Sequence, residues 1–167
     1  MAEPGPVVPT YSFMEGVTTL RDLPNVPISK DAIALRIPNE NDGTCTEISY
    51  QKLENLVEST ATAFCETAGL GREPGNTVSI IMPNIIPFIL AFLAVPYTRS
   101  VSAPLNQDYT QAEYKFYIED NQSKLVLVPD HGDGIPAAEA AAAELGLSVY
   151  SVGYNLKSGE ATVTHKS

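Results

Sequence analysis

The chain has few of the residues that build metal sites and disulfide frameworks. Its 167 residues include two cysteines, Cys45 and Cys65, and two histidines, His131 and His165, which lie far apart in the sequence. A zinc site needs clustered ligands, so we expect no metal site. The two thiols are expected to be buried structural residues in a reducing compartment.

Positive charge is also scarce. Ten lysines and arginines stand against twenty acidic residues, which gives a formal net charge of −10 at pH 7. Proteins that bind a nucleic-acid backbone display stripes of Lys and Arg, and this composition argues against such a function.

Targeting and membrane signals are missing as well. The N-terminal residues contain neither a basic region nor an apolar core, so they do not form a secretory signal. The longest apolar stretch, Ile80 to Val95, is interrupted by Pro83, Asn84 and Pro87 and is too short to cross a bilayer. The last three residues, from His165 on, do not form the peroxisomal tripeptide Ser-Lys-Leu. We expect a soluble, intracellular protein.

The composition that remains is globular. Hydrophobic residues make up 44% of the chain and charged residues 18%, which is enough apolar material for a compact core. The first part of the chain is rich in proline and lacks periodicity. We therefore expect an N-terminal arm over residues 1–30 and an α/β unit over residues 31–167.

Strand-like segments alternate with helical segments through the α/β unit. The first two strands are expected to form a hairpin with a turn at residues 41–43, and the later strands are continuous apolar runs. Such runs, separated by helices, predict an α/β fold with a mostly parallel sheet and helices on both faces. The expected strands are Ala32–Ile37, Cys45–Ile48, Thr77–Met82, Ser100–Ala103, Leu125–Val128 and Ser148–Val152. The expected helices begin after Ser49, Asn84, Thr110 and Ile135.

Several residues mark where these helices begin and end. Ser49 has the chemistry of an N-cap, and Gly69 is suited to end the helix that follows. Asn84 is expected to cap the second helix, with Pro87 in its first turn, where a missing N–H costs little. Thr110 and Glu113 have the spacing of a capping box.

The glycines of Gly69–Gly75 resemble a dinucleotide-binding fingerprint only in spacing. That fingerprint follows a strand and opens a helix, so that the pyrophosphate meets the helix N-terminus. Here a helix comes first and a strand follows, so we expect a turn. The sequence also contains no P-loop, no GxSxG elbow and no HExxH motif.

Asp130 is the one carboxylate placed at the C-terminal end of an apolar strand, where open α/β sheets bind their ligands. A phosphate-accepting aspartate would need further carboxylates nearby to hold Mg²⁺. Together with His131, Gly132, Asp133 and Gly134, Asp130 is better explained as part of a polar loop. The residues themselves assign no catalytic, cofactor-binding or metal-binding position.

The span from Ile48 to Pro129 resembles the opening of the AMP-dependent acyl-activating enzymes. Its most specific part is Met82–Asn84, followed by Phe88–Ala94 and then by Ala103–Asn106, which is similar to the family's P-N-x-x-x-F-x-x-x-F-L-A … P-L-N pattern. In that pattern Phe88 and Phe92 are expected to pack the second helix on the sheet. The segment Thr98–Asn106 looks most like the branch of oxalate–CoA ligases and peroxisomal coenzyme A synthetases.

The resemblance implies an acyl-CoA synthetase that uses ATP, Mg²⁺, CoA and a small-molecule carboxylate, in the cytoplasm or the peroxisome. The family's phosphate loop, ATP-ribose motif, hinge aspartate and catalytic lysine do not occur here, so no functional residue is carried over. Two departures, Ser100 in place of a glycine and Pro96 near a helix end, fall between Ala94 and Val101.

Two interpretations follow from the resemblance. The chain is either the N-terminal subdomain of an acid–thiol ligase, inactive alone, or a non-catalytic α/β interaction or regulatory module that retains the scaffold. As a fragment, it is expected to self-associate through exposed apolar surface.

Overall fold

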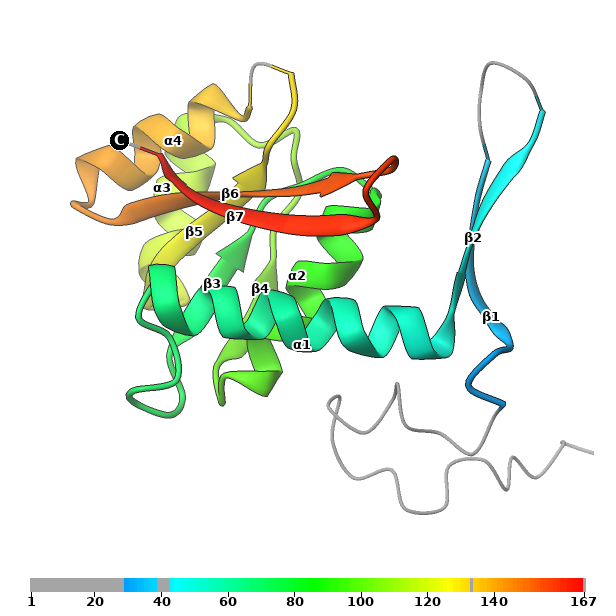
Figure 1. Ribbon diagram of the computed structural model, residues 1–167. Coiled ribbons are helices and arrows are strands. Elements are labelled where there is room, and N and C mark those ends of the chain that lie inside the picture. Colours follow the sequence, from blue (N-terminus) through cyan, green and yellow to red (C-terminus); the bar gives the residue numbers. More distant parts are fainter. Residues whose placement is uncertain (1–28, 39–42, 133, 167) are drawn as a thin grey trace, which may run out of the picture.

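The computed structural model consists of a five-stranded sheet with helices on both faces and a separate β-hairpin (Figure 1). It describes residues 29–38, 43–132 and 134–166. The expected N-terminal arm, residues 1–30, lies almost entirely outside the described residues. None of the helices in the described part of the chain is long and apolar enough to cross a membrane.

The hairpin consists of β1 (Ile33–Pro38) and β2 (Cys45–Ser49), which pair antiparallel. It leads directly into α1 (Tyr50–Thr67) and stands at the amino end of that helix, away from the five-stranded sheet (Figure 1). Both predicted strands are confirmed. Part of the predicted turn lies outside the described residues, but Gly43 has the positive φ of 70° that such a turn requires.

The sheet has the strand order β4–β3–β5–β6–β7. Its first four members are parallel, and β7 runs antiparallel to β6. This arrangement confirms the predicted fold class. Strand β7 was not among the predicted strands, because its alternating residues are mostly polar or small. The strands are β3 (Thr77–Ile80), β4 (Val101–Pro104), β5 (Ser123–Pro129), β6 (Ser148–Asn155) and β7 (Glu160–Lys166).

The helices cover the sheet in two layers. Helix α1 and α2 (Ile86–Tyr97) pack on one face, in a core that includes Phe64 and Leu127. Helices α3 (Gln111–Asp120) and α4 (Pro136–Glu144) pack on the other face, in a core that includes Tyr114 and Val126. Adjacent residues of β5 thus belong to opposite cores, as the alternation of a strand dictates.

Local hydrogen bonds explain where two of the helices begin. The Ser49 hydroxyl accepts a hydrogen bond from the Lys52 N–H at 3.2 Å, which confirms the predicted N-cap. At α3, the Thr110 N–H donates to the Glu113 carboxylate at 2.8 Å and the Glu113 N–H donates to the Thr110 hydroxyl at 3.4 Å. The predicted capping box is therefore present in full.

The predicted cap of the second helix is wrong. Helix α2 begins at Ile86, and its N-cap is Ile85, which makes no side-chain capping bond. The Ile85 N–H donates to the Pro83 carbonyl, so a tight turn separates Asn84 from the helix. Asn84 stands one residue too early to reach the helical N–H groups. Pro87 does lie in the first turn, as predicted.

The residues that attach α2 to the sheet also differ from the prediction. Phe88 and Phe92 stack on each other, with ring centroids 6.1 Å apart, and are only partly buried. Ala91 and Ala94 are fully buried instead, beside Leu90 and Val95. Small side chains on this face let the helix approach the sheet closely, and the aromatic pair lies beside that face.

Candidate functional site

The strand order changes direction between β3 and β5. After β3 the chain crosses through α2 on one face to β4, and after β5 it crosses through α4 on the other face to β6. The segments that leave the carboxyl ends of β3 and β5 therefore diverge and leave a crevice between them. In open α/β sheets, ligands bind at this kind of position.

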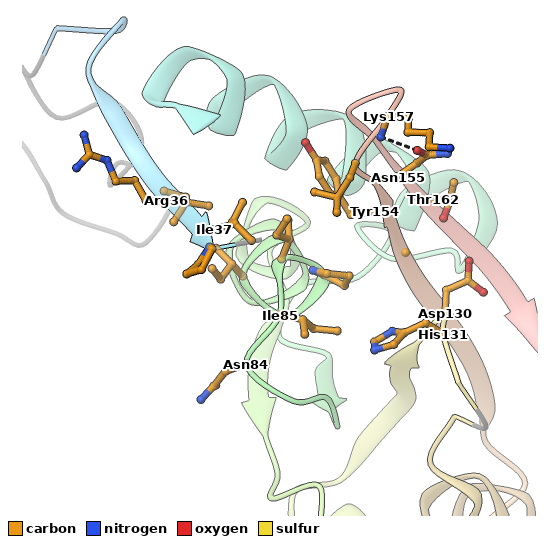
Figure 2. A pocket seen from close by; sticks show the side chains of 17 residues that line it. Arg36, Ile37, Asn84, Ile85, Asp130, His131, Tyr154, Asn155, Lys157 and Thr162 are labelled. Carbon is orange, nitrogen blue, oxygen red and sulfur yellow. Dashed lines mark hydrogen bonds between the residues drawn. The ribbon is translucent and has the colours of Figure 1, made fainter. Parts of the chain in front are cut away.

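A cavity of about 1010 Å³ lies at this crevice, between the hairpin and the carboxyl ends of the strands (Figure 2). Its apolar walls come from Leu35 and Ile37 of β1 and from Ile86 and Ile89 of α2. Most of its polar groups follow or lie on β5, β6 and β7. The polar lining residues are Arg36, Asn84, Asp130, His131, Tyr154, Asn155, Lys157 and Thr162.

Asp130 is held in place by its neighbours on β6. Its backbone N–H donates to the Val152 carbonyl at 3.0 Å, and the Ser151 hydroxyl donates to its carboxylate at 3.3 Å. The predicted position at the end of a strand is confirmed. The carboxylate points toward Thr162, whereas the His131 ring points toward the α2 side of the cavity (Figure 2).

Gly153 makes this arrangement possible. A Cβ atom at Gly153 would lie 2.6 Å from the Thr162 hydroxyl and 2.8 Å from the Asp130 carboxylate, which is closer than real Cβ atoms approach. Sequence reasoning missed both Gly153 and Thr162. The sequence feature that could have identified this position is a glycine inside a strand, because such a glycine often marks the close approach of another group.

Tyr154 was also missed. It lies on β6 next to Gly153, so its side chain extends to the opposite face from Asp130, toward the core of α1 and α2. Burial raises the pKa of the Tyr154 phenol. The phenol therefore stays protonated at neutral pH and can serve as a hydrogen-bond donor but not as a base.

The glycine-rich segment is a turn, as predicted. Gly69, Gly71 and Gly75 all have positive φ, and the segment joins the end of α1 to the start of β3, at the opposite end of that strand from the cavity. Its backbone groups form hydrogen bonds with Arg99. The Arg99 guanidinium donates to the Gly71 carbonyl at 2.6 Å, and the Gly75 N–H donates to the Arg99 carbonyl at 2.8 Å.

The prediction of buried thiols is wrong. Cys45 and Cys65 are both exposed and unpaired. Cys45 is the first residue of β2 in the protruding hairpin, and Cys65 follows the buried Phe64 on α1, which turns it toward solvent. Among residues 29–38, 43–132 and 134–166, no group of three or more His, Cys, Asp or Glu side chains is placed to hold a metal ion.

In a comparison with known protein families, residues 26–164 match the family model described as AMP-binding enzyme. The oxalate–CoA ligase of Arabidopsis thaliana is 39% identical over 94 residues, which are 56% of this chain and 18% of that protein. The oxalate–CoA ligase of Saccharomyces cerevisiae is 33% identical over 104 residues, 59% of this chain and 18% of that protein. The chain thus spans less than a fifth of the length of these relatives.

Apo MatB from Rhodopseudomonas palustris has a similar fold, with a TM-score of 0.64 and 22% sequence identity. The match covers 85% of this chain and 26% of that one. These comparisons bear out the resemblance that the motifs indicated.

Proposed function

The chain belongs to the family of AMP-binding enzymes, and from this premise we propose that it is the N-terminal α/β subdomain of an ATP-dependent acid–thiol ligase. Residues 31–167 would form this incomplete subdomain and residues 1–30 an arm that precedes it. The observation that most supports this proposal is the sequence identity of 39% to an oxalate–CoA ligase. An intracellular location, cytoplasmic or peroxisomal, belongs to the same proposal.

The proposed reaction of the complete enzyme has two steps. A carboxylate attacks the α-phosphate of ATP, which forms an acyl-adenylate and releases pyrophosphate. The thiol of CoA then attacks the acyl carbon, which forms acyl-CoA and releases AMP. ATP, Mg²⁺ and CoA are the proposed cofactors and co-substrates; of these, ATP is bound in a structure of MatB from Rhodopseudomonas palustris, whose fold is similar.

The described residues do not fit an ATP–Mg²⁺ site by themselves. Phosphates need cations and free backbone N–H groups, and a carboxylate beside them opposes their binding. Two cations, Arg36 and Lys157, line the cavity, but Arg36 is paired with Glu47 at 3.0 Å, and Asp130 adds negative charge. At the start of α2, Pro87 has no N–H, and the Phe88 N–H donates to the Ile85 carbonyl.

We therefore expect residues 1–167 to be inactive alone. The purified chain, incubated with ATP, Mg²⁺, CoA and a panel of carboxylates that includes oxalate and fatty acids, should release no pyrophosphate and form no acyl-CoA. Calorimetry should detect no specific ATP binding. The Arabidopsis oxalate–CoA ligase with oxalate serves as the positive control. Carboxylate-dependent release of pyrophosphate by the chain would contradict the proposal.

A chimera distinguishes a ligase subdomain from a non-catalytic module. The 94 aligned residues of this chain would replace their counterparts in the Arabidopsis oxalate–CoA ligase. If the segment is a ligase subdomain, the chimera should keep measurable oxalate-dependent formation of acyl-CoA. A chimera that folds, as judged by circular dichroism, but forms no product would favour the non-catalytic module.

A further inference from the structure

The segments that carry the family resemblance meet around one small groove in the folded chain. Met82–Asn84 follow β3, Phe88 lies in the first turn of α2, and Pro104–Asn106 end and follow β4. Together with Gln107, residues of these segments line a groove of about 330 Å³. Because β3 and β4 are parallel neighbours, their carboxyl ends lie side by side. The groove is thus at the edge of the sheet where open α/β folds bind ligands.

The described residues that line the groove carry no charge. The carboxamide side chains of Asn84, Asn106 and Gln107 supply its hydrogen-bonding groups, and each carboxamide offers both a donor and an acceptor. The other lining residues are apolar: Met82, Pro83, Phe88, Pro104 and Leu105. Phosphate and carboxylate groups need cationic partners. The groove therefore suits an uncharged ligand that carries amide or hydroxyl groups along an apolar chain.

Hydrogen bonds fix the loop that forms one wall of the groove. The Tyr114 hydroxyl donates to the Asn106 backbone carbonyl at 2.9 Å, and the Leu105 N–H donates to the Ile80 carbonyl at 3.0 Å. The side-chain carbonyl of Asn106 accepts a hydrogen bond from the Asp108 N–H at 3.1 Å. This bond orients the carboxamide and leaves its NH₂ group to donate to a ligand.

Asn84 connects the groove to the larger cavity. It lines both spaces, so the two adjoin. Its side chain is exposed and points away from Asp130 and His131 (Figure 2). The turn closed by the Ile85 N–H and the Pro83 carbonyl, at 2.8 Å, holds its backbone in place. An elongated ligand in the groove can therefore extend past Asn84 into the cavity.

The neutral lining selects among the substrates of the proposed reaction, and this step rests on the proposed function. ATP and the carboxylate both bring charged groups to their sites. The pantetheine arm of CoA, between the phosphates and the thiol, is an uncharged chain with amide groups, a hydroxyl group and apolar carbon atoms. We infer that the groove binds this arm, with Asn84 and Asn106 hydrogen-bonded to its amides and its thiol end directed past Asn84 into the cavity.

Binding of pantetheine itself tests the assignment. In an NMR titration of ¹⁵N-labelled residues 1–167 under reducing conditions, the side-chain NH₂ signals of Asn84, Asn106 and Gln107 should shift and saturate, with a Kd of about 1 mM or below. Adenosine, the other uncharged part of the substrates, should leave these signals in place. The absence of saturable shifts at these side chains overturns the inference, and so do equal shifts with adenosine.

Substitutions in the groove give a second test. Asn84→Ala removes one carboxamide and should weaken pantetheine binding about threefold to tenfold. Asn106→Asp keeps the acceptor for the Asp108 N–H but loses the NH₂ donor, and it should weaken binding to a similar extent.

The matched control is Asn55→Ala, which removes an exposed carboxamide from the surface of α1 and should leave the affinity unchanged. The backbone amide spectrum of each variant verifies its fold. An affinity that Asn84→Ala leaves unchanged overturns the inference, as does an equal loss in Asn55→Ala.

The inference and the proposed function can fail separately. Pantetheine binding in the groove together with an inactive chimera would support the groove assignment and contradict the ligase proposal. An active chimera together with no pantetheine-dependent shifts would support the ligase proposal and overturn the groove assignment.

Discussion

At the scale of single residues, Pro96 shows how the fold accommodates a departure from a regular helix. Proline has no N–H to donate to the carbonyl four residues earlier, here that of Phe92. Helix α2 nevertheless continues through Pro96 to Tyr97. The Ser102 hydroxyl of β4 donates to the Phe92 carbonyl at 2.9 Å and replaces the missing donor. Ser102 thus supplies the hydrogen bond that Pro96 cannot make.

We predict that Ser102→Ala destabilises the protein by about 1–3 kcal/mol, because it leaves the Phe92 carbonyl without its donor. In a Pro96→Ala background, the restored N–H can serve that carbonyl, and the same serine substitution should cost less. Urea unfolding of the two single variants and the double variant measures the coupling. Additive losses would show that Ser102 does not compensate for the proline.

At the scale of the elements, local signals predicted the boundaries that depend on local chemistry. Ser49, Gly69 and the Thr110–Glu113 pair each act within a few residues of their own position. The prediction that Asn84 caps the second helix failed because a turn, closed by a hydrogen bond to the Pro83 carbonyl, shifts the start of α2. The missed strand β7 depends on a partner strand, and its own sequence shows only weak alternation.

The capping box should make α3 sensitive to substitution and to pH. Thr110→Ala should cost about 0.5–2 kcal/mol without altering the fold. Hydrogen bonds from the Thr110 backbone N–H and hydroxyl hold the pKa of Glu113 below its ordinary value. The resulting stabilisation is present above the unfolded-state pKa of Glu113 and is lost as the pH falls through the lowered one.

Unfolding of the wild type and of Glu113→Gln, compared at neutral and acidic pH, tests this dependence. The glutamine can accept the same hydrogen bonds but does not titrate. The difference in unfolding free energy between the two proteins should therefore shrink in acid. A difference that stays constant with pH would assign the stabilisation to something other than the carboxylate.

At the scale of the whole molecule, the fold class was predictable and the cavity was not. Continuous apolar strands between helices determine a parallel sheet covered on both faces. The cavity, by contrast, requires the hairpin to face the carboxyl ends of the strands, so that Leu35 and His131, which are far apart in the sequence, line the same space. Asp130 could be placed at a strand end from sequence, but its neighbours Gly153 and Thr162 come from strands that only the folded sheet brings together.

The position of the hairpin has a consequence for the dynamics of the protein. A two-stranded sheet is marginally stable unless other elements support it. This one is joined to the rest through the buried Ile48, through the first turn of α1, and through Ala34, Leu35 and Ile37, which are only partly buried against the core. It should therefore open independently of the larger sheet.

Hydrogen–deuterium exchange should show the amides of β1 and β2 losing protection well before those of β5, and equal protection would contradict this. Because β1 also carries one wall of the cavity, each such opening would expose the apolar side chains of Ile86 and Ile89 to solvent while both helical layers stay folded.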